Sequence, residues 1–378
     1  MVLQVRSSVL NYKRDSYLGN EVKLNPDFDL IDCAVGYSQW GLSQKAYEAF
    51  QNFDLSSVTQ YGELFYDASL KLKILERFNI SGVTKSNLFL GHGSFNLSER
   101  LIHKLINPTN MLGIGPQFNE IPSEFIAAGG QYIPIPIDPI TSELPIEQLK
   151  SELGSGNYSV LYLDNPNNPL GYFLPLDEVR ELVQIAEGHG TLVLVDEAYG
   201  DFIEDAQSAF HLVSQFSNLA VVRSMSKGLG LAAERVGYMF LSEPVAKLYG
   251  QLDVPFEPTA IAASLAGAAM TDFSFTETIR NSVRTDKAKI INQLKKLGIT
   301  VLPNHPDVSI FSVYKSDTDL VQMFSSIGVS VEPGSVFSNL NPVWNDNYCR
   351  VRVPARKHVD EFCQRLVTLG NTEAKYAT

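Results

Sequence analysis

Short apolar runs alternate with helical patterns through the middle of the chain, and this alternation restricts the possible folds more than any other feature. We expect strands at residues 87–90, 111–114, 132–137, 158–163, 191–195, 219–223 and 236–241. Helices are predicted between them at residues 96–105, 122–128, 145–153 and 176–187. Apolar strands that alternate with helices are typical of a mostly parallel sheet with helices on both faces. The sequence therefore predicts an α/β fold whose ligands lie beyond the carboxyl ends of the strands.

The pattern differs at both ends of this region. The first residues are mostly polar, which predicts an arm that packs on another part of the molecule. A charged helix at 276–297 leads into short strands around a helix at 318–326, which indicates a smaller α+β unit. We therefore divide the chain into residues 1–45 (an arm and part of the small domain), 46–275 (a large domain with the candidate site) and 276–378 (a C-terminal small domain).

Composition excludes several classes of protein. The 378 residues are 44% hydrophobic and 19% charged, as in folded globular proteins. The net charge of −12 argues against a nucleic-acid partner, because phosphates need a basic face. The three scattered cysteines lack metal-binding spacing, so we expect no metal site, and they suit a reducing compartment. We find neither a signal peptide nor a run long enough to span a membrane, so we expect a cytoplasmic protein.

The apolar run at 219–223 is followed by Lys227 on a glycine-rich loop. A lysine at the end of a core strand can form a Schiff base with an aldehyde cofactor. The hydroxyls of Ser224 and Ser226 and the guanidinium of Arg235 suit a phosphate group. The combination indicates pyridoxal phosphate, and the alternative is a surface lysine in a turn.

A second anion site is predicted where Gly93 and Ser94 stand between a strand and a helix. Unpaired N–H groups and the helix dipole favour a phosphate there, although an ordinary helix cap is the alternative. The stretch is not a GxGxxG fingerprint, so a dinucleotide is not indicated.

Two further strand ends carry polar groups. Asn165 and Asn168 each precede a proline, which restricts the backbone and so the directions of their side chains, although a plain turn is the alternative. Asp196 directly follows an apolar run, and Tyr199 comes three residues later. A buried carboxylate needs a cationic partner such as a protonated pyridine nitrogen, although Asp196 could instead cap the next turn.

The stretches 165–171, 196–199, 224–238 and 349–353 resemble, in order and spacing, those of the class I/II aminotransferases, which are fold-type I pyridoxal-phosphate enzymes. The Asn-Pro-Asn-Asn-Pro turn and the Asp-Glu-Ala-Tyr stretch are most similar to the histidinol-phosphate aminotransferase-like branch. The resemblance covers nearly the whole chain. It implies a three-layer α/β/α large domain with a mostly parallel sheet, a smaller α+β domain, and a homodimer that acts on small molecules.

The resemblance also implies a role for each candidate residue. Lys227 would hold the cofactor and shuttle the substrate's α-proton, and Asp196 would keep the pyridine nitrogen protonated. Asn168 and Tyr199 would donate to the phenolic oxygen. Phe118 would stack on the ring, although ordinary packing is its alternative. The cofactor's phosphate would meet Gly93, Ser94, Ser224, Ser226, Arg235 and, from the neighbouring subunit, Tyr61, for which ordinary packing is again the alternative. Phe95 would also contact the cofactor. The substrate would meet Arg350, Tyr37 and Glu332, with Arg350 pairing with a carboxylate.

Glu332 departs from that branch, because it stands about where those enzymes carry a phosphate-binding arginine. The loop at 35–41 also lacks their Asn-Glu-Asn-Pro sequence, so both features argue against a phosphorylated substrate. Our hypothesis is that Glu332 favours a substrate with a positive tail. Arg352 lies two residues after Arg350, on the same strand face, and we favour a surface charge over a second anion contact.

The sequence thus predicts a pyridoxal-phosphate-dependent aminotransferase that moves an amino group between an amino acid and a 2-oxo acid through Lys227. The alternative is a decarboxylase, lyase or cyclase that uses the same site. A regulatory protein without turnover is disfavoured, because we find no helix-turn-helix extension or basic segment.

Overall fold

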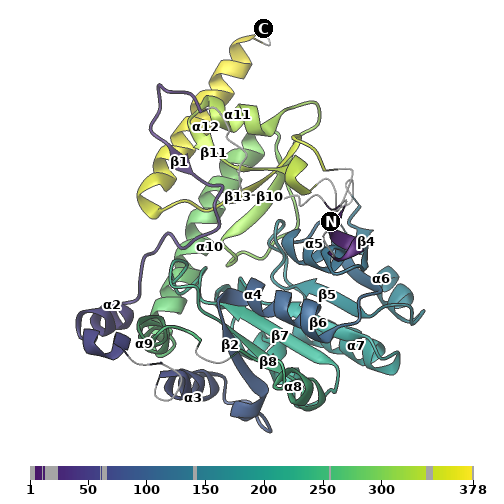
Figure 1. Ribbon diagram of the computed structural model, residues 1–378. Coiled ribbons are helices and arrows are strands. Elements are labelled where there is room, and N and C mark those ends of the chain that lie inside the picture. Colours follow the sequence, from purple (N-terminus) through teal and green to yellow (C-terminus); the bar gives the residue numbers. More distant parts are fainter. Residues whose placement is uncertain are drawn as a thin grey trace, which may run out of the picture.

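The computed structural model describes residues 5–10, 12, 24–59, 61, 66–138, 143–254, 257–337 and 344–376. Its centre is a seven-stranded sheet with the strand order β2-β8-β7-β6-β5-β3-β4 (Figure 1). The strands are Leu88–Gly91 (β2), Asn110–Gly115 (β3), Gln131–Pro136 (β4), Val160–Asp164 (β5), Leu192–Asp196 (β6), Leu219–Ser224 (β7) and Gly237–Leu241 (β8). Strand β8 is antiparallel to β2 and β7, and the other pairs are parallel, which confirms the mostly parallel sheet.

Helices cover both faces of this sheet, because neighbouring strand residues point to opposite faces. On β5, Leu161 packs in one core and Tyr162 in the other, and both are fully buried. The first core also holds residues from Tyr66–Phe78 (α3), Ile146–Leu153 (α6), Leu176–Gly188 (α7) and Ala260–Ala269 (α9). The second holds residues from Gly93–Arg100 (α4), Glu120–Ala127 (α5) and Glu243–Tyr249 (α8). These layers confirm the expected α/β/α arrangement.

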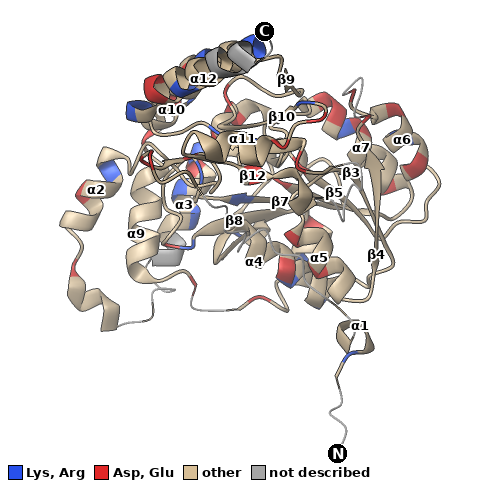
Figure 2. Ribbon diagram, turned by 90° about the horizontal axis from the view of Figure 1, so that it is seen from above, with Lys and Arg blue, Asp and Glu red and all other residues tan. Residues whose placement is uncertain are grey.

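A smaller antiparallel sheet, β12-β13-β10-β9, is built from later residues. Its strands are Thr300–Val301 (β9), Ile310–Tyr314 (β10), Glu332–Pro333 (β12) and Tyr348–Arg352 (β13). The helices beside it are Phe273–Lys296 (α10), Leu320–Ser326 (α11) and Arg356–Tyr376 (α12), and Lys, Arg, Asp and Glu all lie along α12 (Figure 2). Figure 1 shows this group above the larger sheet.

The N-terminal segment contacts both units: its first helix packs against α5 of the larger unit, where the Ser8 hydroxyl donates to the Ala127 carbonyl at 2.7 Å, and residues 25–33 then pair with the smaller unit. Strand Ile31–Asp32 (β1) pairs in parallel with Val329–Ser330 (β11), and the chain then continues into helix Gln44–Gln51 (α2). The division near residues 45 and 275 stays a prediction. In the arm, Ser7–Leu10 forms a short helix (α1), and residues 1–4, 11 and 13–23 lie outside the described residues.

Helices α8 and α12 are among those absent from the sequence-based prediction. Helix α12 buries Val359, Phe362 and Leu366, whose spacing of three and four residues is the signal that could have identified it. Helix α4 begins at Gly93 rather than at residue 96, because Gly93 adopts a φ of 88° that lets the chain turn directly from strand to helix.

Candidate active site

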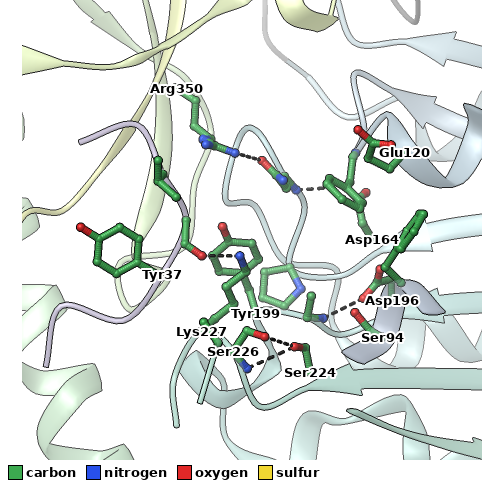
Figure 3. Close-up of a pocket in the computed structure, with 18 of the residues that line it drawn as sticks. Tyr37, Ser94, Glu120, Asp164, Asp196, Tyr199, Ser224, Ser226, Lys227 and Arg350 are labelled. Atoms are coloured by element: carbon green, nitrogen blue, oxygen red, sulfur yellow. Dashed lines mark hydrogen bonds between the residues drawn. The ribbon is translucent and has the colours of Figure 1, made fainter. Parts of the chain in front are cut away.

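A cavity of about 570 Å³ lies at the carboxyl ends of the central strands, as expected for this kind of sheet (Figure 3). It brings together most of the candidate residues predicted from the sequence. These are Tyr37, Ser94, Phe95, Phe118, Asn168, Asp196, Tyr199, Ser224, Ser226, Lys227, Arg235 and Arg350. The described residues hold no cluster of histidine, cysteine, aspartate or glutamate suited to a metal ion. In the same part of the chain, no helix is long and apolar enough to cross a membrane.

Lys227 extends into this cavity from the loop after β7, so it is not a surface lysine in an ordinary turn. Its amine donates a hydrogen bond to the carbonyl of Gly36 and lies 5.7 Å from the centre of the Tyr199 ring. Burial, followed by the positive charges of Arg350 and Arg235, lowers the pKa of Lys227 to about 8. Roughly a tenth of this amine is therefore neutral, and so nucleophilic, at pH 7, far more than for a lysine with an ordinary pKa.

Asp196 ends β6 with its carboxyl group buried below the cavity. One oxygen accepts a hydrogen bond from the backbone N–H of Ala198 at 2.9 Å. Burial raises the pKa of Asp196 to about 7, although Ala198 and the positive charge of Lys227 oppose the rise. A cationic ring nitrogen beside this carboxyl group would restore the ionised form, so Asp196 fits the partner that the sequence indicated.

A group of donors lies where β7 and α4 meet. The Ser224 hydroxyl contacts that of Ser226 at 2.8 Å, and Arg235 Nη1 lies 3.4 Å from the Ser226 hydroxyl. The N-cap residue of α4, His92, makes no side-chain cap, and the N-terminus of a helix favours an anion. A Cβ at Gly93 would lie only 2.9 Å from Arg235 Nη2. Glycine thus keeps open a cradle of suitable size and charge for a phosphate.

Asp164 is a cavity residue that sequence reasoning missed. Its Oδ2 accepts the backbone N–H groups of Phe118 and Asn168, both at 3.0 Å, and its Oδ1 accepts side-chain donors from Gln117 and Asn167. Asp164 therefore fixes both the aromatic wall and the Asn-Pro turn. The signal was present, because Asp164 directly follows the apolar run of β5 just as the identified aspartate follows β6.

Arg350 reaches the cavity from β13 with only 2% of its surface exposed. Its Nη1 donates to Asn168 Oδ1 at 2.8 Å, so Arg350 contacts the Asn-Pro turn that follows β5. Its Nη2 donates to the carbonyl of Ala34 at 2.6 Å and lies 3.3 Å from Glu332 Oε2. The guanidinium thus connects the N-terminal segment, the small sheet and the large domain.

The prediction for Arg352 was wrong, because this side chain is 1% exposed and not a surface charge. Its guanidinium pairs with Asp32 Oδ2 at 2.9 Å and covers the ring of Tyr37 at 4.9 Å. The sequence could not reveal this burial, because the N-terminal strand that supplies Asp32 lies some 320 residues away in the chain.

Three candidates lie outside the cavity lining. Glu332 is buried behind Arg350, Gly93 lies beside Arg235, and Tyr61 is 73% exposed. Further lining residues were not predicted, namely Val35, Gly36, Glu120, Pro166, Ala198 and Ala232.

A family model described as aminotransferase class I and II matches residues 29–366. Histidinol-phosphate aminotransferase 1 of Dechloromonas aromatica is 28% identical over 308 residues, which cover 80% of this chain and 82% of that protein. Among solved structures, histidinol-phosphate aminotransferase from Sinorhizobium meliloti in complex with pyridoxal-5'-phosphate has a TM-score of 0.75 at 18% identity, over 91% of each chain. Aspartate aminotransferase from Thermus thermophilus with maleate has a TM-score of 0.77 at 17% identity, over 91% of this chain and 92% of that chain.

These matches confirm the expected fold, the histidinol-phosphate aminotransferase-like branch, the enzyme class and the cofactor. The family model spans nearly the whole described structure, including both sheets. The chain therefore belongs to the class I and II aminotransferase family, whose members are pyridoxal-phosphate-dependent enzymes.

Proposed function

We propose that this enzyme transfers the amino group of an amino acid to a 2-oxo acid, with Lys227 as the residue that carries the proton. The observation that supports this most directly is the position of the Lys227 amine, inside the cavity and between Tyr199 and the Gly36 carbonyl. Pyridoxal phosphate, when bound, supplies an electron sink for the substrate's α-carbon. Its phosphate fits the Ser224, Ser226 and Arg235 cradle.

The surrounding residues would orient the cofactor and tune the lysine. Asp196 would keep a proton on the ring nitrogen, and Asn168 and Tyr199 would donate to the ring oxygen. Phe118, held by Asp164, would limit movement of the ring. Once released from the cofactor, the Lys227 amine would take the substrate's α-proton and return it to the cofactor. A base with a pKa of about 8 suits such a transfer near neutral pH.

The substrate would lie between the cofactor site and the N-terminal segment. Arg350 would pair with its carboxylate, and Tyr37 would form the outer wall. Relatives named histidinol-phosphate aminotransferases suggest a phosphorylated substrate. We propose a substrate without a phosphate, because the buried carboxylate of Glu332 adjoins Arg350 and would repel a second anionic group.

We also propose that the enzyme is a cytoplasmic homodimer. Large apolar side chains are exposed along one short stretch, at Leu42, Tyr47, Phe50, Leu55, Val58 and Tyr61. Such a concentration is typical of a protein interface. Tyr61 would reach the phosphate of the cofactor that the neighbouring subunit binds. The buried free thiols Cys33 and Cys349 suit a reducing compartment.

The visible absorbance of the cofactor-loaded enzyme tests the proposed reaction. We expect one class of amino donor to bleach the band while one keto acid forms per subunit. Adding a 2-oxo acid should then restore the band. A band that every donor leaves unchanged, or that changes with release of carbon dioxide or ammonia, would instead indicate the decarboxylase, lyase or cyclase alternative.

A further inference from the structure

Both hydrogens on Nη2 of Arg350 already have protein acceptors in this structure. A guanidinium can bind a carboxylate with two hydrogen bonds on two faces, one formed by Nε–H and Nη2–H and the other by Nη1–H and Nη2–H. Both faces therefore use a hydrogen of Nη2. In this structure Nη2 donates to the Ala34 carbonyl and to Glu332 Oε2. Bidentate binding thus requires one of these two partners to leave.

Glu332 is the partner that can leave more easily. Its Oε2 lies 3.3 Å from Nη2, whereas the Ala34 carbonyl oxygen lies at 2.6 Å. Ala34 directly follows the segment that β1 and the Cys33 backbone fix to the small sheet, so its carbonyl has little freedom to move. Nε of Arg350 is buried and has no hydrogen-bond partner among the described residues, so one half of a binding face is already available.

Among the described residues, Arg350 is the only cation that pairs with Glu332, so a displaced Glu332 would lose its ion-pair partner. Its side chain is buried opposite Arg350 in the β12–β13 register, and the nearby Asp32 is also acidic. Arg352 is the other guanidinium close by, and it pairs with Asp32 through both its side chain and the Asp32 carbonyl. A buried carboxylate left unpaired is unfavourable unless it becomes neutral.

We propose, building on the proposed role of Arg350, that a substrate carboxylate binds Arg350 in exchange for Glu332 and that the displaced Glu332 takes up one proton from solvent. Burial and the negative charge of Asp32 raise the pKa of Glu332, while Arg350 opposes this rise. When Arg350 pairs with the substrate instead of Glu332, its positive charge no longer opposes this rise. The pKa of Glu332 is therefore higher in the complex than in the free enzyme. The other charged groups around the cavity are Lys227, Arg235, Asp196, Asp164 and Glu120.

Proton uptake makes the affinity for carboxylates fall as the pH rises. Between the pKa of Glu332 in the free enzyme and that in the complex, the dissociation constant should increase about tenfold per pH unit. The Glu332→Gln variant keeps a neutral acceptor of the same size, so it should bind carboxylates at least about tenfold more tightly at pH 8 and lose this part of the pH dependence.

Titration calorimetry on the cofactor-loaded enzyme measures the exchange directly. We would titrate hexanoate and 3-phenylpropanoate, which have no amino or keto group, in buffers of different ionisation enthalpy. The wild-type enzyme should take up one more proton per ligand than Glu332→Gln. Glu120→Gln removes a carboxylate that lines the same cavity without touching Arg350, so its proton uptake should match the wild type.

The Arg350→Leu variant separates the two proposals. Binding that survives this substitution would overturn the proposed role of Arg350 itself. Binding that depends on Arg350, together with equal proton uptake in the wild type and in Glu332→Gln, would leave that role intact and overturn the exchange. A thermal unfolding curve on each variant shows whether it is folded.

Discussion

At the scale of single residues, the protonation state of Lys227 controls capture of the cofactor. Burial, Arg350 and Arg235 lower the pKa of Lys227 from 10.5 to about 8, so the amine is neutral above about pH 8 in the folded protein. Only the neutral amine attacks an aldehyde. We expect the rate at which cofactor-free enzyme captures pyridoxal phosphate to rise with pH and to level off above about pH 8, as followed by stopped-flow absorbance. A rate that still climbs tenfold per unit between pH 9 and 10 would contradict this, and Lys227→Ala should show no covalent capture at all.

Glu332 carries the prediction about the substrate's side chain. If the Glu332 carboxylate pairs with a positive tail once the substrate has displaced it from Arg350, Glu332→Gln should lower kcat/KM for basic amino acids relative to neutral ones by roughly tenfold, the effect of losing one charge-assisted hydrogen bond. With a neutral substrate the displaced Glu332 takes up a proton, whereas a positive tail would pair with its carboxylate instead, so the ratio of the two kcat/KM values reports whether the tail meets Glu332. An unchanged ratio would reject a basic substrate.

At the scale of secondary-structure elements, a buried ion pair joins the ends of β6 and β7 below the cavity. Arg223 donates to Glu197 Oε2 at 2.5 Å and to Asp205 Oδ1 at 3.1 Å, and both Arg223 and Glu197 are almost fully buried. The Arg223→Met variant would leave the carboxylate of Glu197 unpaired directly beside Asp196. We expect a loss of ~3–5 kcal/mol in the free energy of unfolding. Urea unfolding measures it.

Arg180→Met is the matched control for this prediction. Arg180 forms an exposed ion pair with Asp177 at 3.9 Å, so its loss should cost no more than ~1 kcal/mol. Similar losses in both variants would mean that the buried network does not stabilise the strand ends.

The strands of the larger sheet were predicted from sequence to within one or two residues, because a strand buried on both faces must be apolar throughout. The same reasoning found Asp196, Asn168 and Lys227, which are polar residues at or shortly after the ends of such runs. It did not find what depends on contacts between distant segments. The burial of Arg352, the pairing of Arg350 with Glu332 and the antiparallel direction of β8 all depend on which segments meet, and local patterns do not specify that.

At the scale of the whole molecule, the exposed apolar stretch between Leu42 and Tyr61 predicts a homodimer. Replacement of Leu55 and Val58 by glutamate places two charges in this stretch, where the side chains are 71% and 55% exposed. These changes should leave the fold intact and shift the enzyme towards monomers, as measured by sedimentation equilibrium. A wild-type protein that sediments as a monomer at micromolar concentration would reject the dimer.

The site itself should need both subunits, because Tyr61 lies outside the cavity lining of its own chain. A hybrid dimer of Tyr61→Phe and Lys227→Ala subunits tests this. If Tyr61 acts across the interface, the Tyr61→Phe subunit keeps its own Lys227 and receives an intact Tyr61 from its partner, so one of the two sites is complete. The purified hybrid should then show about half the activity of the wild type, with the cofactor affinity of the wild type at that site.

If Tyr61 instead serves its own chain, every site in the hybrid lacks either Tyr61 or Lys227, and the activity should not exceed half that of the Tyr61→Phe homodimer. The activity of the hybrid therefore shows whether the Tyr61 hydroxyl acts in the site of its own subunit or in that of the partner subunit.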